Sequence, residues 1–390
     1  MTGGAASVAR LLIQDLPDRT CLRIDGRQSR ASILVGFLRH AARALGDDPM
    51  LLGHSIHWES REICRVLVAL GFDVDVIDIG SPPPATERPY AASLTLHDHL
   101  LKIGPVLARD AVKMMWMTGS HPAFQNSAEM ERIQWLEERR GCVYEPKRQI
   151  ANVPGELAAV ELADRCLLVG NATTLSTYPA GWHRKMELIA VSAAGVHAPK
   201  DPTGFVPPSR EFVWYSSSGA VLKGLDLVLD VFAARRFPTL HVIGSVEREE
   251  DFLNIYHAEL DGHPRIRRHG FLRGDDPRLA EVFGRSVAVL HPSASEGMSG
   301  SVTHCLQIGL YPIISRTSGI DLPEGAGAYL DACTAPAIEG AVEKVLAMPT
   351  PVLAEEIGRI QRVALERHAR PAFTSRLLDV LGRWLAHLPR

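Results

Sequence analysis

The sequence predicts an α/β protein in which two doubly wound domains face a central cleft. The chain has 390 residues, more than one ordinary core accommodates, so we expect two domains. Short apolar runs alternate with helical patterns along most of the chain, which is typical of βαβ units in a mostly parallel sheet. Four prolines in the segment 198–210 preclude a helix or a central strand there, and we interpret this segment as the interdomain linker.

In the first half, apolar runs and amphipathic spacing define the expected elements. The expected strands cover residues 50–53, 72–79, 112–117, 166–169 and 187–191. The expected helices cover residues 60–70 and 128–140, and a polar loop at 118–126 precedes the second helix. That helix carries Met130, Ile133 and Leu136 on one side and paired charges on the other, which favours a helix with one buried face.

The second half repeats the alternation more regularly. The expected strands cover residues 212–216, 239–243, 268–272, 287–291 and 311–315. The expected helices cover residues 225–234, 251–260, 277–283, a stretch from about 300, 335–348, 353–368 and 374–387. Strand sequences such as VAVLH are apolar on both faces, as expected where helices cover both sides of a parallel sheet.

The composition narrows the class of protein. Hydrophobic residues make up 46% of the chain, which excludes a disordered or collagen-like protein, and the formal net charge of -3 gives no case for binding duplex nucleic acid. The six cysteines lie at least 24 residues apart, so no CxxC pair exists, and we expect buried thiols in a reducing compartment. Without a signal-peptide or membrane-spanning pattern, we expect a cytoplasmic protein, with peripheral contact to the inner membrane face left open.

The segment 291–301, HPSASEGMSGS, carries the most chemical information. A buried strand runs into a polar loop, and a helix then begins with the small residues Gly300 and Ser301. Amides at a helix start favour anions, so this arrangement predicts a cradle for a diphosphate. Glu296 would accept hydrogen bonds from sugar hydroxyls, and His304 would share the helix face that points to the cleft. The alternative is an ordinary loop with a solvent-facing glutamate and a serine cap.

A second signal lies in SSSGAVLKGLD, where Lys223 and Gly224 begin the helix that follows the first strand of the second half. Two βα loops of a doubly wound sheet can face the same crevice. Lys223 would then supply a point charge to phosphates held at Gly300. A lysine at a helix start can equally be a solvated surface residue, and this alternative stays open.

In their order along the chain, these motifs resemble the donor half of group 1 (family 4-like) retaining glycosyltransferases, which have the GT-B fold. Four elements occur in the order that the family shows. They are Lys223-Gly224, a strand ending in Gly244, HGFL at 269–272, and PSASEG at 292–297 followed by GLYPIIS. The resemblance covers residues 212–322 well, and the first half only in outline.

The resemblance implies transfer of a sugar from a nucleoside diphosphate sugar to an acceptor, with retention at the anomeric carbon and without an obligatory metal or further cofactor. The acceptor would be a sugar, a lipid-linked molecule or another small molecule. By position, Glu296 would bind donor-sugar hydroxyls, Lys223 would neutralise the departing diphosphate, and the amides of Ser299 to Ser301 would hold phosphate oxygens. The implied domains are an acceptor-side domain at 1–200, a donor-binding domain at 201–370, and a terminal helix at 371–390 that returns to the first domain.

Two positions depart from the family pattern. The family has a second glutamate where this chain has His304, and a neutral imidazole offers one acceptor rather than the several of a carboxylate. The family also tends to carry an arginine shortly before the lysine, where this chain has Ser217 and Ser218. Only one of the two usual cations is therefore expected. A scaffold or binding protein with a decayed site stays open as an alternative, as does a nucleotide-sugar epimerase or a glycogen-type phosphorylase on the same fold.

Two loops supply candidates in the first half. Family members often place a histidine near the donor's anomeric carbon, which makes His121 in TGSHPAFQN the candidate; the alternative is a histidine that caps a turn. Asn126 would lie on the acceptor side or cap the following helix. In HSIHWES, His57, Trp58 and Glu59 would line an acceptor pocket, with Trp58 offering a face on which a sugar ring stacks. The alternative is that Trp58 packs internally and Ser60 caps the helix.

The remaining polar residues of the first half give weaker indications of a function. His54, His57 and Glu59 have a loose metal-like spacing without a fourth ligand, so we expect no metal site. Four basic residues surround a turn, and we expect them on a solvated face, with an anionic acceptor or a membrane surface as the alternative. They are Arg139, Arg140, Lys147 and Arg148.

Overall fold

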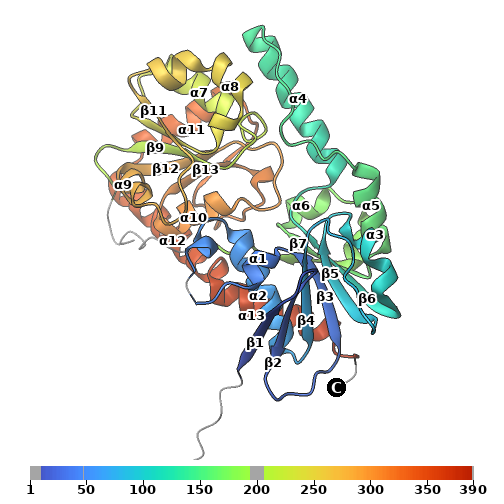
Figure 1. Ribbon diagram of the computed structural model, residues 1–390. Helices are drawn as coiled ribbons and strands as arrows, with labels where there is room; N and C mark the ends of the chain where they lie inside the picture. Colours follow the sequence, from blue (N-terminus) through green and yellow to red (C-terminus); the bar gives the residue numbers. More distant parts are fainter. Residues whose placement is uncertain (1–9, 47, 194–205, 389–390) are drawn as a thin grey trace, which may run out of the picture.

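The computed structural model describes residues 10–46, 48–193 and 206–388, so most of the predicted linker, 198–205, lies outside the described residues. The chain forms two sheets, one from each half, and the predicted two-part α/β architecture is confirmed (Figure 1). The strand order is β1-β2-β4-β3-β5-β6-β7-β8 in the first sheet and β11-β10-β9-β12-β13-β14 in the second.

The first sheet is parallel from β4 to β8 across its order, with the antiparallel strands β1 and β2 at one edge. Its strands are β1 Leu11–Asp15, β2 Thr20–Ile24, β3 Ser32–Phe37, β4 Asp73–Asp78, β5 Tyr90–Leu96, β6 Leu107–Met117, β7 Arg165–Val169 and β8 Met186–Ile189. Its helices are α1 Arg39–Ala42, η1 Pro49–Leu52, α2 Ser55–Ala69, α3 His99–Ile103, η2 Gly104–Val106, α4 Pro122–Arg140, α5 Val153–Leu162, α6 Ala172–Ser176 and η3 Ala180–Lys185.

All strand pairs of the second sheet are parallel. Its strands are β9 Glu211–Tyr215, β10 Leu240–Ile243, β11 Ile266–Gly270, β12 Ser286–His291, β13 Tyr311–Ser315 and β14 Ala328–Leu330. The helices of this half are α7 Leu225–Ala234, η4 Val246–Arg248, α8 Glu250–Ile255, the π-helix η5 Ala258–Gly262, α9 Pro277–Arg285, α10 Gly300–Ile308, η6 Arg316–Ser318, α11 Ala335–Ala347, α12 Thr350–Arg367 and α13 Arg370–Trp384.

Three expectations for the first half are wrong. Residues 50–53 form no strand, because Pro49 starts the 3-10 helix η1 and the side chain of Asp48 caps it. Helix α2 begins at Ser55 rather than at residue 60. Helix α4 begins at Pro122 rather than at residue 128, so the expected loop at 118–126 is largely helical.

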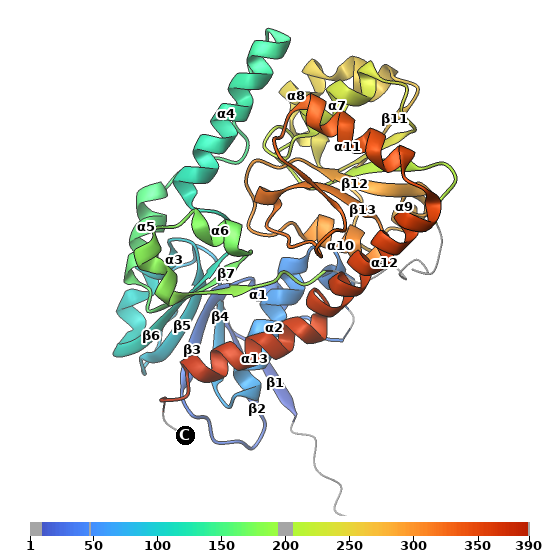
Figure 2. The ribbon, with the colours of Figure 1, turned by 180° about the vertical axis from the view of Figure 1, so that it is seen from behind.

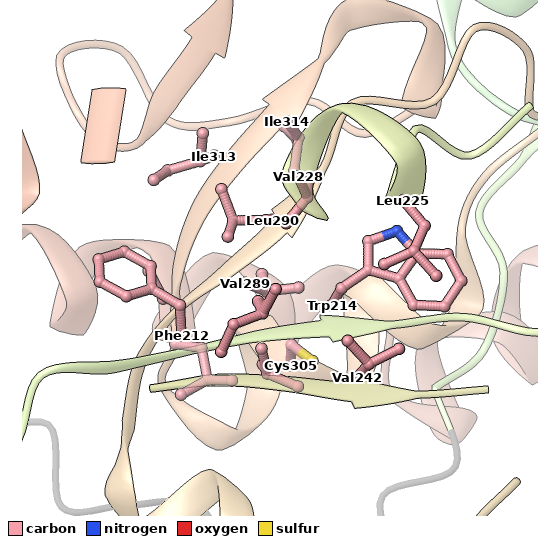
Figure 3. Packing of buried hydrophobic residues seen from close by; sticks show 14 of the residues in the cluster. Phe212, Trp214, Leu225, Val228, Val242, Val289, Leu290, Cys305, Ile313 and Ile314 are labelled. Carbon is pink, nitrogen blue, oxygen red and sulfur yellow. The ribbon is translucent and has the colours of Figure 1, made fainter. Parts of the chain in front are cut away.

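The core of the second half shows why its strands were easy to recognise. Val289 and Leu290 are successive residues of β12, so their side chains point to opposite faces of the sheet, and both are fully buried. They pack with residues from neighbouring strands and from helices α7 and α10 (Figure 3). Helices therefore cover both faces of this parallel sheet, as the strand sequences predict.

The last helix belongs to the core of the first half. After α12, the chain crosses along the back of the molecule, and α13 packs on α2 (Figure 2). Phe373, Leu377 and Leu381 of α13 are buried in the same cluster as the first sheet. The two halves are thus joined by the C-terminal helices as well as by the segment after β8.

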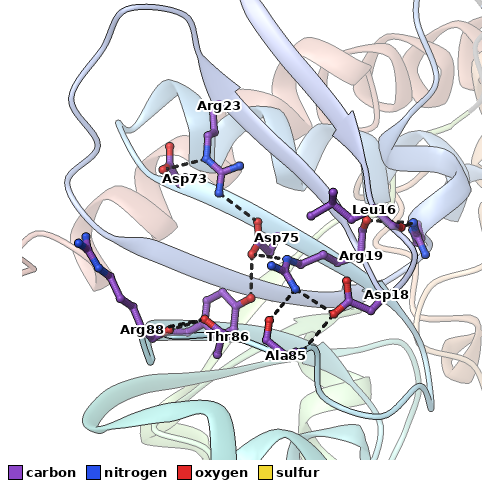
Figure 4. A network of polar contacts seen from close by, with 11 residues as sticks. Leu16, Asp18, Arg19, Arg23, Asp73, Asp75, Ala85, Thr86 and Arg88 are labelled. Carbon is purple, nitrogen blue, oxygen red and sulfur yellow. Dashed lines mark hydrogen bonds and ion pairs between the residues drawn. The ribbon is translucent and has the colours of Figure 1, made fainter.

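The antiparallel edge of the first sheet is tied to the parallel part by a buried carboxylate (Figure 4). Asp75 of β4 accepts a hydrogen bond from the Tyr90 hydroxyl at 2.8 Å. Its oxygens also lie 3.1 Å from Arg19 Nε and 3.7 Å from Arg23 Nη2. Because the two arginines come from the β2 region and Tyr90 from β5, the contacts of Asp75 span several strands.

Among the described residues, no helix has the length and apolar character needed to cross a membrane.

Candidate functional site

A cleft of about 400 Å³ lies where the carboxyl ends of the two sheets meet. Its lining includes residues from the segments that follow strands of both halves, among them Thr118 after β6, Ser216 after β9 and Glu296 in the loop after β12. We call this space the central cleft. Open α/β sheets bind ligands at this end of their strands, so the central cleft is the candidate site.

The loop between β12 and α10 is held by both halves of the chain. Ser120 Oγ of the first half donates a hydrogen bond to the Glu296 carbonyl at 2.9 Å, and Thr174 Oγ1 donates to the Gly297 carbonyl at 2.8 Å. A Cβ on Gly297 would lie only 2.4 Å from a backbone oxygen of the first half, so only glycine fits there. The position of Glu296 is therefore fixed by contacts across the cleft.

The structure brings the two predicted catalytic residues of the second half together. Lys223 Nζ lies 3.3 Å from Glu296 Oε1 and donates a hydrogen bond to Ser217 Oγ at 3.1 Å. His291 Nε2 lies 3.4 Å from the same Glu296 oxygen. Burial alone would raise the pKa of Glu296, but the charge of Lys223 and the contact with His291 lower it to about 2. Neither residue is the solvated surface group of the alternative interpretation.

The start of α10 has part of the geometry that the predicted phosphate cradle needs. Ser299 caps α10, and its side chain accepts a hydrogen bond from the Val302 amide. Its own amide donates to the Ser318 carbonyl at 3.2 Å and is therefore engaged. The amides of Gly300 and Ser301 belong to the first turn, where a helix offers them no acceptor, and both residues line the central cleft.

Two predicted glycines allow close backbone approaches beside the cleft. Gly224 caps α7 with a φ of +73°, and a Cβ there would lie 2.6 Å from the Pro292 carbonyl oxygen. Gly244 follows β10, and a Cβ there would lie 2.6 Å from the Ser216 carbonyl oxygen. Both glycines let two backbone segments approach closely, and neither belongs to the lining of the central cleft.

His304 also lines the central cleft, but mainly as a packed ring. It makes edge contacts with the rings of Tyr215 and Phe283, and only 2% of the residue is exposed. Its position on α10, one turn after Gly300, agrees with the predicted shared helix face.

The first half contributes a wall from the start of α2. His54 caps this helix, with Nδ1 accepting from the Ile56 amide, and burial lowers its pKa. Glu59, one turn further along, is 3% exposed, and its Oε1 accepts hydrogen bonds from the amide and the hydroxyl of Ser192. Burial raises the pKa of Glu59 to about 7 against these hydrogen bonds. His54, Ser55 and Glu59 all line the central cleft.

The predicted acceptor residues of this helix lie elsewhere. Trp58 is 5% exposed and packs edge-on against Phe373 of α13, so the expectation that it offers a stacking face to a sugar is wrong. His57 Nδ1 lies 3.1 Å from the Met50 carbonyl, and its ring packs against His40. Because α2 begins at Ser55, these two side chains point into the protein while His54 and Glu59 face the cleft. Within the described part of the chain, no cluster of three or more metal-ligating side chains occurs.

His121 and Asn126 lie at the start of α4 and have structural contacts. His121 caps the helix through Nδ1, which accepts from the Ala123 amide, and its ring packs against Tyr178 and Trp182. The capping alternative thus describes its geometry. Asn126 lies inside the helix and forms two hydrogen bonds with the backbone of Ile150, so it holds the following loop rather than facing an acceptor.

A smaller recess of about 330 Å³ adjoins the central cleft. Its lining includes Thr118, Arg148 and Glu296, which also line the cleft, and polar side chains of the first half such as Gln125 and Glu156. A larger and shallower basin of about 930 Å³ lies at the amino ends of β6 to β8. Since parallel sheets bind ligands at the opposite end, we favour the central cleft and its recess.

The four basic residues at the end of α4 and in the loop after it differ in their contacts, and three of them form ion pairs. Arg139 pairs with Asp226 and Asp230, Arg140 with Asp230 and Glu259, and Lys147 with Asp251, all from the second half. Arg148 instead lines the central cleft. The sequence did not separate these roles, because the partner carboxylates lie far away along the chain. His54 and Arg148 are polar cleft residues that the sequence did not assign to the site, whereas Glu59, expected on the acceptor side, does line the cleft.

Solved structures with the same overall fold are glycosyltransferases or related proteins. Sucrose-phosphate synthase of Thermosynechococcus elongatus is 14% identical, and the match covers 91% of this chain and 99% of that one, with a TM-score of 0.63. HepE of Anabaena, solved with UDP and glucose, is 11% identical over 90% of this chain and 100% of that one, with a TM-score of 0.56. TarM of S. aureus, solved with UDP, is 11% identical over 75% of this chain and 55% of that one, with a TM-score of 0.52.

These matches establish the fold: the chain has the two-domain GT-B architecture. No family model matches the sequence, and no curated protein matches it either. The identities are too low for the fold to carry a substrate with it.

Proposed function

We propose that this protein is a glycosyltransferase that moves a sugar from a nucleoside diphosphate sugar to an acceptor with retention of configuration. One observation carries the proposal. Lys223, Glu296 and the first amides of α10 converge at one end of the second sheet, at the edge of a cleft that the first half closes. A cation and unpartnered helix amides suit a diphosphate, and the carboxylate beside them suits sugar hydroxyls.

In the proposed reaction, the diphosphate lies against the amides of Gly300 and Ser301, with Lys223 offsetting the negative charge that develops as it leaves. No metal ion or organic cofactor is required for this step in the proposal, because fixed cations and helix amides supply the positive charge. Glu296 holds the donor sugar in place, and the rate gain comes from positioning and from stabilising the leaving group. HepE was solved with UDP-glucose and TarM with UDP, which agrees with a nucleotide-sugar in this fold.

We place the acceptor in the recess beside the cleft. The recess shares Glu296 and Arg148 with the cleft, so an acceptor hydroxyl there would lie next to the donor sugar. Its other polar side chains, such as Gln125 and Glu156, suit a hydroxylated acceptor such as a sugar or a lipid-linked sugar. We propose a cytoplasmic site of action, where nucleotide-sugars are available.

The test is a panel of nucleoside diphosphate sugars, with binding measured by calorimetry and slow donor hydrolysis measured by release of the nucleoside diphosphate. We expect at least one donor to bind and to be hydrolysed, and K223A and E296A to abolish the hydrolysis. K344A is the matched control, because Lys344 is an exposed lysine on α11 and does not belong to the cleft lining. A folded protein that binds no donor would contradict the proposal and favour a scaffold with a decayed site.

A further inference from the structure

The side chain of Arg148 crosses from the first half of the chain to the donor side of the central cleft. Its stem lies against Gly219, in the loop between β9 and α7. A Cβ on Gly219 would be 2.6 Å from Arg148 Cγ and 3.1 Å from Cδ, and Gly219 has a φ of +91°. Only glycine accepts both this backbone conformation and the contact. The loop is therefore shaped around the arginine.

The same loop carries the groups that contact Lys223. Ser217, two residues before Gly219, accepts the hydrogen bond from Lys223 Nζ. Arg148, Ser217, Lys223 and Glu296 all line the central cleft. The charge of Arg148 contributes to lowering the pKa of both Glu296 and His54, which agrees with a guanidinium that faces the cleft.

The loop that carries Arg148 is rigidly held. The buried carboxylate of Glu129 accepts hydrogen bonds from the amides of Lys147 and Arg148 at 2.9 and 2.8 Å, and Gln125 donates to the Arg148 carbonyl at 2.7 Å. Asn126 adds two hydrogen bonds to Ile150. The side chains of α4 therefore fix the backbone on both sides of Arg148.

A buried carboxylate also joins this loop to the donor side. Glu249 is 2% exposed, and it accepts hydrogen bonds from the Tyr144 hydroxyl at 2.8 Å and from the amides of Gly219 and Ala220. Tyr144 lies just before the Arg148 loop, and Gly219 lies under the Arg148 stem. The two loops are therefore fixed to one common group, and the guanidinium is preorganised over the donor side.

Arg148 differs from its basic neighbours in having a free charge. In the described part of the chain, its guanidinium has no ion pair, whereas Lys147 pairs with Asp251 at 2.7 Å. The charge of Lys223 is offset by Glu296. An exposed guanidinium beside a lysine, with no carboxylate of its own, is suited to a phosphate group, which it can bind through two parallel hydrogen bonds.

We infer that Arg148 binds the diphosphate of the donor and is the second cation of the donor site, supplied by the first half of the chain. This inference rests on the proposed function. The family pattern has an arginine where this chain has Ser217 and Ser218. Arg148 would supply that positive charge from the other half of the chain, since its side chain lies over the same loop. This assignment also makes donor binding depend on contact between the halves, because Arg148 belongs to the first half and its stem lies against Gly219 of the second.

The experiment compares the full-length protein with R148M, R148K and K147M. Methionine keeps the apolar stem over Gly219 and removes only the charge, lysine keeps the charge, and K147M removes a neighbouring cation from the same loop. Binding of UDP, GDP and ADP and of the matching monophosphates is measured by calorimetry, and folding is checked by thermal melting. We expect R148M to weaken the best nucleoside diphosphate by about 10–100-fold, as for loss of a charge-assisted contact, with a smaller loss for the monophosphate.

Melting of R148M should match the wild type, R148K should bind more tightly than R148M, and K147M should bind within about twofold of the wild type because its partner is Asp251. Unchanged diphosphate binding in R148M would overturn the inference and leave the proposed function standing. Equal losses for diphosphate and monophosphate would also overturn it, because they would indicate a general distortion. A wild-type protein that binds no nucleoside diphosphate would overturn the proposed function itself.

Discussion

Two glutamates line the central cleft from opposite halves of the chain, and their carboxyl groups behave in opposite ways. Glu296 follows β12, and its pKa is lowered to about 2. Glu59 lies on α2, and its pKa is raised to about 7. Both side chains are largely buried, with 16% of the Glu296 side chain and 3% of Glu59 exposed. Burial alone therefore does not decide which form is stable.

The difference comes from the neighbours of each carboxylate. Desolvation disfavours the charged form of both, but Lys223 stands 3.3 Å from Glu296, whereas Glu59 has only the neutral amide and hydroxyl of Ser192. The charge of Lys223, together with the contributions of His291 and Arg148, thus reverses the direction of the pKa shift. The second-half wall of the cleft therefore holds an ion pair, and Glu59 in the first-half wall keeps its proton until about neutral pH.

Removal of the Lys223 charge should have the largest effect on the difference between Glu296 and Glu59. In K223M, Glu296 keeps its buried position without a compensating charge, so its pKa should rise as that of Glu59 does. We expect the free energy of unfolding at pH 7 to fall by about 3–5 kcal/mol, as for a buried ion pair that loses one partner. Urea denaturation measures this loss.

Two control variants test whether the loss of stability in K223M comes from the ion pair with Glu296. K344M removes an exposed lysine and should change stability by less than about 0.5 kcal/mol. The double variant K223M/E296Q should be more stable than K223M, because the buried charge is removed as well. If K223M were as stable as K344M, the ion pair would not be the cause of the lowered pKa.

The next largest effect is expected from E296Q. A carboxyl whose pKa is about 2 in the folded state and about 4.5 when unfolded stabilises the fold above pH 4.5 and loses this contribution as the pH falls toward 2. E296Q should therefore lose about 3 kcal/mol at pH 7, and the gap to the wild type should narrow below pH 4.5. Denaturation at pH 7 and pH 3 tests the sign; a gap that widened at low pH would contradict it.

The fold of the second half was predictable because its strands are apolar on both faces. The run VAVLH in β12 fits a buried strand better than a helix or a loop. Helix α7 was predicted with the same bounds as the structure shows. In the first half, β4, β6, β7 and β8 match expected strands, whereas β1, β2, β3 and β5 were not predicted. β1 lies at a sheet edge with mostly exposed residues, and the apolar run at 50–53 belongs to a 3-10 helix that a proline starts. Burial on one face only, at an edge, leaves a weak sequence pattern.

The site was predictable only where its residues lie on one half. Lys223 and Glu296 follow strands of the same parallel sheet, so the topology alone brings them together. Arg148 reaches the cleft from a loop of the first half, and no spacing along the chain predicts that it lines the same cleft as Lys223. Trp58 and His57 show the same limit, because the start of α2 at Ser55 decides which side chains face inward.

E59Q should change stability in the direction opposite to E296Q. The folded-state pKa of about 7 lies above the unfolded value of about 4.5, so the wild type loses stability as the pH rises from 4.5 through 7, by about 2.5 kcal/mol between pH 5 and pH 8. An amide at position 59 cannot ionise. We expect this pH-dependent loss to be absent from E59Q, so that the variant gains on the wild type between pH 5 and pH 8; a parallel decline in both proteins would contradict the assignment.

The smallest effect is expected from S192A, which tests whether the hydrogen bond from the Ser192 hydroxyl limits the rise in the pKa of Glu59. S192A removes the hydroxyl that donates to Oε1 at 3.2 Å and leaves the amide that donates at 3.0 Å. The ionised form of Glu59 loses more than the protonated form, so its pKa should rise further, and stability at pH 8 should fall by about 1 kcal/mol. The decline between pH 5 and pH 8 should be steeper in S192A than in the wild type. In the E59Q background, S192A should not change how stability depends on pH between pH 5 and pH 8. If it did change that dependence, the Ser192 hydroxyl would act on a group other than Glu59, and the contrast between the two glutamates would not rest on their hydrogen-bond partners.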